Sequence, residues 1–185
     1  LPMPPGCLPT IWNNHDRFVD GYLRTFDGYY VSGDGGYIDE DGYLFVQGRT
    51  DDIINVAGHR LSTGEMEEVV AGHEAIAECA VIGQASDLKG EEPLGLLLLK
   101  DGVTIDEATL ESEVIQRVRE NIGAVASFRH AVVVQRLPKT RSGKILRKVL
   151  RNIANSEEYQ TPSTIDDPAC LVEIEDVLSK KGLRK

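Results

Sequence analysis

The chain has few cysteines and no long apolar run, and each absence removes a class of protein. Its three cysteines, Cys7, Cys79 and Cys170, are far apart and show no C-x-x-C spacing, so neither a disulfide framework nor a zinc site is indicated. Apolar runs such as Leu96 to Leu99 are far shorter than the roughly 20 residues that a transmembrane helix requires. We therefore expect no membrane-spanning segment and interpret that run as a buried strand.

Basic residues are also in the minority. Lys and Arg together number 20 against 30 Asp and Glu, which gives a net charge of −10. Such a charge repels nucleic acid and anionic membranes, so we expect neither as a general partner. The chain of 185 residues is 41% hydrophobic, enough for one packed domain and a piece of another.

The start of the sequence is unlike a natural amino terminus. It begins with Leu1 instead of Met, runs into a proline-rich stretch (Pro2, Pro4, Pro5) and has no secretory signal. We therefore expect the chain to be a piece of a longer polypeptide.

Turn residues and apolar spacing predict an α+β (mixed α/β) fold. A hairpin is expected where Asp41-Gly42 divides 36–38 from 43–46, and a capping box at Ser62–Glu65 opens a helix through about Ala71. The helix 106–122 has helical apolar spacing and a natural stop at Gly123. The remaining predicted strands are 53–56, 79–82, 96–99 and 131–134, and the remaining helices are 145–153 and one from Asp167-Pro168 to near Gly182.

Three segments contain residues suited to nucleotide chemistry. In the first, Tyr30 to Gly36, the carboxylate of Asp34 lies among glycines and could accept two hydrogen bonds from the vicinal hydroxyls of a ribose. The alternative is that Asp34 only caps a turn. In the second, Arg49 and Arg60 lie near glycines and could hold a phosphate, or each could form a surface ion pair with a neighbouring Asp.

The third segment, 136–151, contains no Asp or Glu in a chain with an excess of acid. Thr140, Ser142 and Gly143 predict a mobile loop that carries Lys144 at its tip, suited to bring positive charge to phosphate or carboxylate oxygens. It is not a Walker A loop, because Lys144 is followed by Ile145 instead of Ser or Thr. The alternatives are a solvated basic face or a nucleic-acid patch.

Taken in this order, the three segments resemble the C-terminal core motifs of the adenylate-forming superfamily. The stretches from Asp51 to Arg60 and from Leu137 to Lys144 are similar to its acetyl-/propionyl-CoA synthetase branch, and the tail 163–168 is similar to that branch's C-terminal tail. The resemblance implies an AMP-forming acid–thiol ligase, an acyl-CoA synthetase. Such an enzyme converts acetate or propionate, ATP and CoA to acyl-CoA, AMP and pyrophosphate through an acyl-adenylate.

The resemblance also implies roles for individual residues. Lys144 would be the catalytic lysine of adenylation, and Asp51 the hinge about which the small domain rotates between the two half-reactions. ATP would be bound by Asp34, Arg49 and Arg60. CoA would be bound by Ala57, Gly58 and Arg119. Ala57 stands where some acetyl-CoA synthetases carry Ser, which removes a hydroxyl contact. A Mg²⁺ would be held by His73 with neighbouring carbonyls, at Ala71 and Ile76, or His73 is a loop histidine without a metal.

We accordingly expect three parts: the β-rich end of the large N-terminal (AMP-binding) domain in 1–50, the mobile C-terminal domain with a central sheet flanked by helices in 51–154, and a tail with a short helix in 155–185. The glycine-rich phosphate loop and the acyl pocket of the superfamily have no match, so the chain is expected to be inactive without the remainder of its N-terminal domain.

The resemblance implies the bacterial cytoplasm or the mitochondrial matrix as the compartment. Acetylation of Lys144 would remove its charge, which makes a lysine acetyltransferase and a deacetylase candidate partners. Two alternatives stay open, namely a free-standing nucleotide- or CoA-binding regulatory module and a ligase for a different carboxylic acid.

Overall fold

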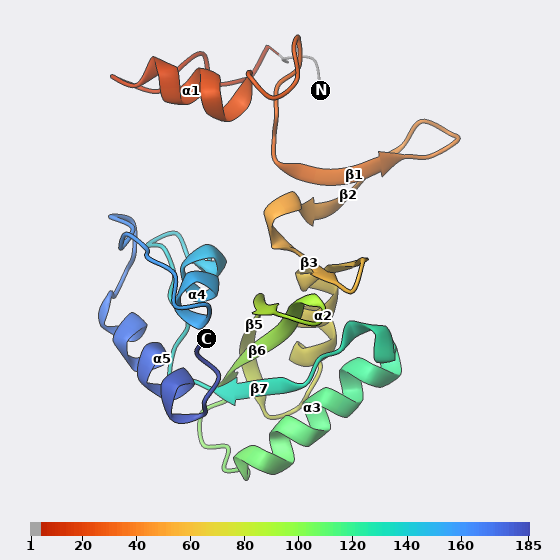
Figure 1. The fold of residues 1–185 in the computed structure, drawn as a ribbon, viewed down its shortest axis with the longest axis vertical. Coiled ribbons are helices and arrows are strands. Elements are labelled where there is room, and N and C mark those ends of the chain that lie inside the picture. Colours follow the sequence, from red (N-terminus) through yellow and green to blue (C-terminus); the bar gives the residue numbers. More distant parts are fainter. Residues whose placement is uncertain (1–4) are drawn as a thin grey trace. The chain divides into compact units, whose positions relative to one another are not determined.

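The computed structural model of the chain describes residues 5–185, and the chain is divided into two compact units, Leu1–Asp51 and Asp52–Lys185 (Figure 1). Pro2 and Pro4 of the expected proline-rich start lie outside the described residues. The division falls next to the expected boundary between 50 and 51. That 1–50 is the end of a larger domain stays a prediction.

The first unit contains one helix and one hairpin. Helix α1 (His15–Tyr22) is capped by Asn14, whose side chain accepts a hydrogen bond from the backbone N–H of Arg17. Strands β1 (Asp34–Ile38) and β2 (Leu44–Arg49) are antiparallel, which confirms the predicted hairpin. The turn is closed by Asp39, whose carboxylate accepts from the N–H groups of Asp41 and Tyr43. Helix α1 was not predicted, because Phe18 is its only buried residue and no apolar repeat results.

The second unit contains a five-stranded sheet. Its strands are β3 (Ile53–Val56), β4 (His59–Ser62), β5 (Ile76–Ser86), β6 (Gly90–Leu99) and β7 (His130–Val133). The order is β4-β3-β6-β5, and β7 joins β6 in parallel at Leu94 to Leu97. Strands β5 and β6 form one long hairpin, of which the predicted strands 79–82 and 96–99 are only the most apolar parts.

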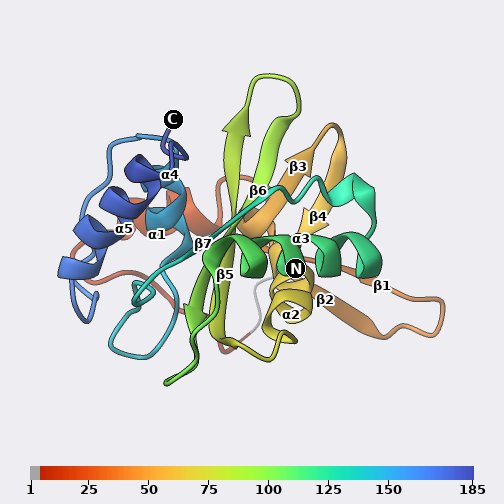
Figure 2. The same ribbon diagram turned by 90° about the horizontal axis from the view of Figure 1, so that it is seen from below.

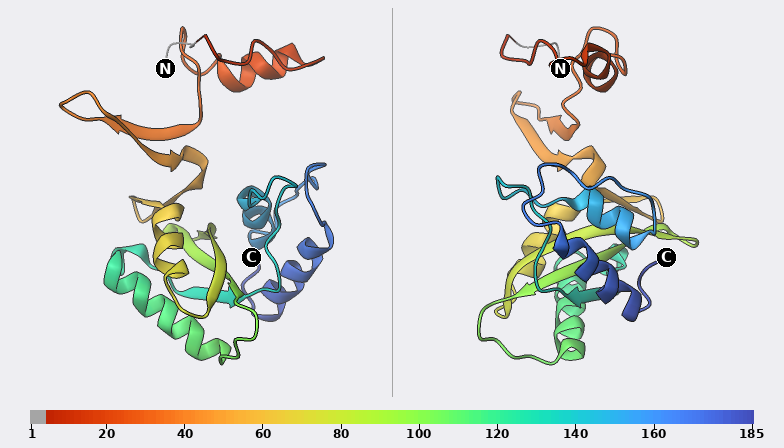
Figure 3. Two further views of the ribbon diagram at one scale, coloured as in Figure 1. Left: turned by 180° about the vertical axis from the view of Figure 1, so that it is seen from behind. Right: turned by 90° about the vertical axis from the view of Figure 1, so that its left-hand side faces the viewer.

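The helices of this unit cover both faces of the sheet, as predicted. Helices α2 (Thr63–Ala71) and α3 (Glu107–Asn121) lie on one face, and α4 (Arg147–Ala154) and α5 (Ala169–Lys180) lie on the other (Figures 2 and 3). The predicted cap of α2 is confirmed, because Ser62 Oγ accepts a hydrogen bond from the N–H of Glu65. Helix α3 is capped in the same way by Asp106, which accepts from Thr109.

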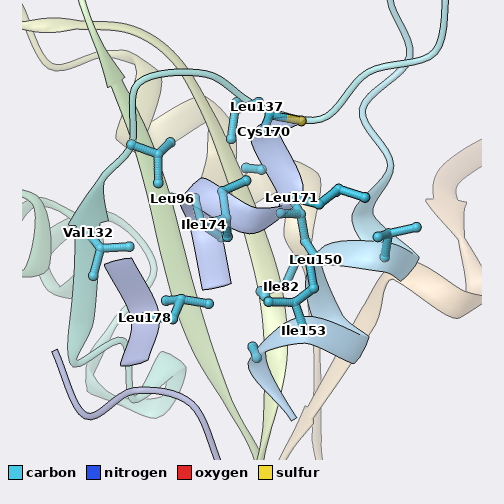
Figure 4. Close-up of a cluster of buried hydrophobic side chains, with 14 of the residues drawn as sticks. Ile82, Leu96, Val132, Leu137, Leu150, Ile153, Cys170, Leu171, Ile174 and Leu178 are labelled. Carbon is cyan, nitrogen blue, oxygen red and sulfur yellow. The ribbon is translucent and has the colours of Figure 1, made fainter. Parts of the chain in front are cut away.

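Each face of the sheet has its own hydrophobic core, because successive side chains of a strand point to opposite faces. Val81 packs with α2 and α3, whereas its neighbour Ile82 packs with α4 and α5. Figure 4 shows the second of these cores. Its buried members on the two helices are Val149, Leu150, Ile153, Ala154, Cys170, Leu171, Ile174 and Leu178.

Residues 155–185 belong to the same compact unit as the sheet. The apolar side of α5 is buried against α4 and the sheet, and the side-chain amide of Gln84 donates hydrogen bonds to the carbonyls of Ala154 and Leu183. The last helix of the chain is therefore part of the core of this unit. No helix among residues 5–185 is long and apolar enough to cross a membrane.

Candidate functional site

The hairpin of the first unit brings together three of the predicted site residues. Arg49 lies opposite Asp34 in the β1–β2 register, with 3.8 Å between its Nη1 atom and Asp34 Oδ1. Its guanidinium also donates to the carbonyl of Ser32 at 2.8 Å and to the carboxylate of Asp51 at 3.0 Å. The carboxylate of Asp34 is 43% exposed and is accessible to the hydroxyls of a ligand.

A glycine is favoured beside this guanidinium by its backbone conformation. Gly33 has φ +77°, which side chains other than glycine rarely adopt. A Cβ atom there would also lie 2.8 Å from Arg49 Nη2, which the flexible arginine side chain would have to leave.

Strands β3 and β4 are joined by the predicted CoA-binding pair. Val56 pairs with His59, so Ala57 and Gly58 form a two-residue loop, and both have positive φ, +49° and +88°. Positive φ at both positions is the signature of a type I′ turn, which costs a non-glycine residue about 1–2 kcal/mol. The N–H of Ala57 donates to the carbonyl of Lys89, which holds this strained turn against the β5–β6 hairpin.

A cavity of about 430 Å³ opens beside this turn, between it and the C-terminal end of α3. Ala57 and Arg119, two of the three residues expected to bind CoA, both line it. The side chain of Arg119 is exposed and makes no ion pair or hydrogen bond with any of residues 5–185. The other lining residues are Val56, His59, Lys89, Val118, Gly123, Ala124, Val125, Ala126, Ser127, Phe128 and Arg129.

Lys89 and Arg129 were not predicted as site residues, although both line this cavity, where each pairs with Glu92, at 2.9 Å and 3.6 Å. Lys89 is brought there by the pairing of Val56 with Gly90, between strands more than thirty residues apart. Its ammonium contacts Glu92 Oε1 at 2.9 Å, and this hydrogen bond lowers the pKa of the Glu92 carboxyl. No local sequence pattern contains that information.

Lys144 lies on a hydrogen-bonded turn, and the mobility of this segment stays a prediction. The N–H of Thr140 donates to the carbonyl of Lys144 and that of Gly143 to the carbonyl of Thr140, both at 2.8 Å. The hydroxyl of Thr140 accepts from the N–H of Lys144 at 3.1 Å and contacts Ser142 Oγ at 3.0 Å. The hydroxyls that suggested mobility therefore close the turn, because side-chain oxygens of Ser and Thr bond readily to nearby backbone.

The side chain of Lys144 is exposed and forms no ion pair within the described part of the chain. At least three other cations of the basic segment are paired with carboxylates. Arg136 pairs with Asp167 and Glu173, Lys139 contacts Glu78 at 2.6 Å, and Arg147 makes a bidentate pair with Glu67 at 2.9 and 2.6 Å. The bonds to Glu67 raise the pKa of the Arg147 guanidinium. The positive potential around Lys144 is consequently weaker than the sequence alone indicates.

Arg60 is exposed on β4, opposite Asn55 of β3, and also makes no ion pair among residues 5–185. It is therefore accessible to an anionic ligand, as its predicted role requires.

Cys79 and Cys170 are not candidates for a nucleophile. Cys79 is buried, and burial together with the nearby Glu67 raises the pKa of its thiol to about 12. Burial also raises the pKa of Cys170. Both thiols are therefore protonated at neutral pH.

The ring of His73 does not fit a metal ligand in this structure. Its Nδ1 accepts a hydrogen bond from the N–H of Ala75 at 3.2 Å, and its Nε2 lies 2.9 Å from Glu113 Oε2, so neither nitrogen has a free lone pair. Its carbonyl accepts from the N–H of Ile76. Among residues 5–185 no group of three or more His, Cys, Asp or Glu could hold a metal. Metal binding at Ala71, His73 and Ile76 stays a prediction, and in this structure its ligands would have to be main-chain carbonyls.

Known proteins with similar sequences identify the family of the chain. Residues 65–144 match the family described as AMP-binding enzyme C-terminal domain. The chain is 47% identical over 97% of its length to the mitochondrial acyl-CoA synthetase short-chain family member 3 of Homo sapiens, and 44% identical over 93% to the acetyl-coenzyme A synthetase of Bdellovibrio bacteriovorus. It covers 26% and 27% of those proteins, about a quarter of each.

A solved structure of an ATP-bound enzyme has a similar fold. The ATP-bound MatB of Rhodopseudomonas palustris superposes with a TM-score of 0.67 at 27% identity, over 81% of this chain and 29% of that one. The chain belongs to the family of AMP-binding enzyme C-terminal domains, and over nearly its whole length it is similar to the C-terminal part of short-chain acyl-CoA synthetases.

Proposed function

We propose that the chain serves as the C-terminal part of an ATP-dependent acyl-CoA ligase. The enzyme joins a short-chain carboxylate, acetate or propionate, to CoA through an acyl-adenylate and releases AMP and pyrophosphate. The observation that carries the proposal is the cavity that joins the Ala57–Gly58 turn to Arg119. It supplies exposed backbone for a narrow chain and a cationic rim for phosphates, which is what CoA presents.

In the adenylation step, Asp34 accepts hydrogen bonds from the ribose hydroxyls, and Arg49 contacts the ribose or a phosphate. Arg60 contacts the phosphate of the adenylate. Lys144 places its ammonium between the carboxylate and the α-phosphate, where negative charge increases as the bond to the adenylate forms. The exposure of Asp34, Arg60 and Lys144 supports these roles, since each must reach a ligand.

In the thioester step, the pantetheine of CoA runs along the Ala57–Gly58 turn and Arg119 meets the nucleotide phosphates. The small size and exposure of Ala57 and Gly58 support this, because the turn presents its backbone instead of bulky side chains. Mg²⁺ would enter with ATP and neutralise phosphate charge.

The proposed partner of the first unit is the remainder of the large N-terminal domain. The hairpin β1–β2 carries exposed apolar side chains that a monomeric domain normally buries. These are Tyr37, Ile38, Leu44, Phe45 and Val46. A lysine acetyltransferase and a deacetylase acting on Lys144 remain proposed partners. The relatives in a mitochondrion and in a bacterium support the mitochondrial matrix or the bacterial cytoplasm as the compartment.

We expect the purified 185-residue chain to show no ATP–pyrophosphate exchange with acetate or propionate. The chain covers about a quarter of its curated relatives and has no match to the phosphate loop or the acyl pocket. The full-length enzyme, assayed in parallel, should catalyse exchange with one of the two acids and form its acyl-CoA. Exchange above the no-enzyme background by the chain alone, or no acyl-CoA from the full-length enzyme with any short carboxylate, would contradict the proposal.

The hinge role of Asp51 leads to a second prediction. Asp51→Pro in the full-length enzyme fixes φ near about −65° at the proposed pivot. It should therefore reduce one half-reaction about tenfold more than the other. Asp51→Ala is the matched control, because it removes the carboxylate bonded to Arg49 but leaves φ free to rotate. Equal losses of both half-reactions in Asp51→Pro, with the fold intact, would place the pivot elsewhere.

A further inference from the structure

The turn that carries Lys144 is bonded to a segment far along the chain. Thr140 forms an antiparallel bridge with Ile165. The N–H of Arg141 donates to the carbonyl of Thr164 at 3.0 Å, and the N–H of Asp166 donates to the carbonyl of Lys139 at 2.9 Å. Residues 164–166 therefore lie beside the turn like a short additional strand.

This segment is itself fixed to the core of the second unit. Ile165 is only 6% exposed and packs in the hydrophobic core that α4 and α5 share. The next residue after the segment, Asp167, pairs with Arg136, which also makes a bidentate pair with Glu173 of α5. Helix α5 thus holds the segment in place, and the segment holds the turn.

The other end of the turn is fixed independently. Arg147, at the start of α4, is bonded to Glu67 of α2, and Glu67 also accepts from the N–H of Val81 in β5. Because both ends of the turn are anchored, the backbone at Lys144 has a defined place in the second unit before any ligand binds. The match to the AMP-binding C-terminal family ends at Lys144, so the residues 164–167 lie outside it.

We propose that residues 164–167, carried by α5, are a positioning element for the catalytic lysine. The proposal rests on the function proposed above for Lys144. A long lysine side chain has many rotamers. A fixed backbone limits the positions that its ammonium can reach. A misplacement of about 1 Å at a catalytic group can cost a factor of about 10².

The test removes one hydrogen bond of the element in the full-length enzyme. Asp166→Pro deletes the N–H that donates to Lys139, while the exposed side chain of Asp166 contributes no contact to the turn. Asp166→Ala is the matched control, because it keeps the N–H. We expect Asp166→Pro to accelerate hydrogen exchange in a peptide covering 138–146, and to slow acyl-adenylate formation about ten- to a hundredfold.

The positioning role can be distinguished from a purely structural one. It requires that Asp166→Pro converts supplied acyl-adenylate and CoA to acyl-CoA at near the wild-type rate. It also requires that Asp166→Ala changes neither step. If Asp166→Pro does not give soluble enzyme, Ile165→Ala loosens the same segment from the core and is assayed in the same way. Hydrogen exchange in α3 serves as the measure of an intact fold.

Three outcomes overturn the proposal. Faster exchange in 138–146 with unchanged adenylation shows that the element does not act through Lys144. Parallel loss of both half-reactions shows that it only stabilises the fold. Normal adenylation in a Lys144→Ala enzyme contradicts the function proposed for Lys144 itself. This outcome differs from the first one, because the Lys144→Ala enzyme still has residues 164–167 unchanged.

Discussion

Replacing Lys144 with alanine in the full-length enzyme is expected to abolish acyl-adenylate formation and to spare the conversion of supplied acyl-adenylate and CoA to acyl-CoA. In the proposed mechanism the ammonium stabilises charge that develops only during adenylation, and loss of one such group typically costs about 10²–10³ in rate. The thioester step is proposed to use another domain orientation, with Lys144 withdrawn. The measurement is ATP–pyrophosphate exchange for the first step and acyl-CoA formation from synthetic adenylate for the second.

The matched control is Lys148→Ala, four residues further along the same segment. Lys148 is also exposed and makes no ion pair within residues 5–185, so its loss removes the same charge from a place without the proposed role. Acetylation of Lys144 should also abolish adenylation and spare the thioester step, because it removes the positive charge. If Lys144→Ala retains near-normal adenylation, or loses both steps equally while folded, the assigned role is wrong.

Arg119→Ala in the full-length enzyme should raise the KM for CoA by roughly ten- to a hundredfold and leave adenylation intact. The side chain lines the cavity beside the Ala57–Gly58 turn and has no ion pair among the described residues that its removal would break. Loss of a hydrogen bond to a charged group is worth about 1.5–3 kcal/mol. The measurement is the CoA dependence of acyl-CoA formation at saturating ATP and carboxylate.

Arg119→Lys is the informative control for this prediction. It keeps the positive charge but loses the planar fork that binds phosphate through two bonds, so an intermediate KM is expected. An unchanged CoA dependence in Arg119→Ala would assign the residue to the surface of α3 and leave phosphate binding to other residues of the cavity.

Local chemistry made several elements predictable. The β1–β2 hairpin follows from Asp41-Gly42 between two apolar segments, α2 follows from its capping residue Ser62, and α3 follows from its apolar spacing and the stop at Gly123. Strand β4 was missed, because His59 to Ser62 is mostly exposed and has no apolar alternation. The predicted strand 96–99 is shorter than β6. Gly90 to Pro93 contains a glycine, a proline and two glutamates, which are rare in strands, yet this segment pairs fully with β5.

The predicted tail marks the limit of what local patterns could determine. Residues 155–185 have a short helix with caps that the sequence indicates correctly, at Asp167-Pro168 and Gly182. That this helix completes a core with α4 and the sheet depends on contacts between residues such as Ile82 and Ile174, which lie far apart along the chain. Spacing within a helix identifies an apolar face but not the partner of that face.

The sequence by itself supplied the ordered set of segments, with Asp34, Arg49, Arg60 and Lys144, on which the resemblance to the adenylate-forming superfamily and the proposed site residues depend. Only the tertiary structure decided how these side chains are held. It placed Lys144 on a turn that is hydrogen-bonded to residues 164–166. It also joined Ala57, Lys89 and Arg119 around one cavity. Both results depend on pairing between distant segments, and pairing of that kind leaves no periodic pattern in the sequence.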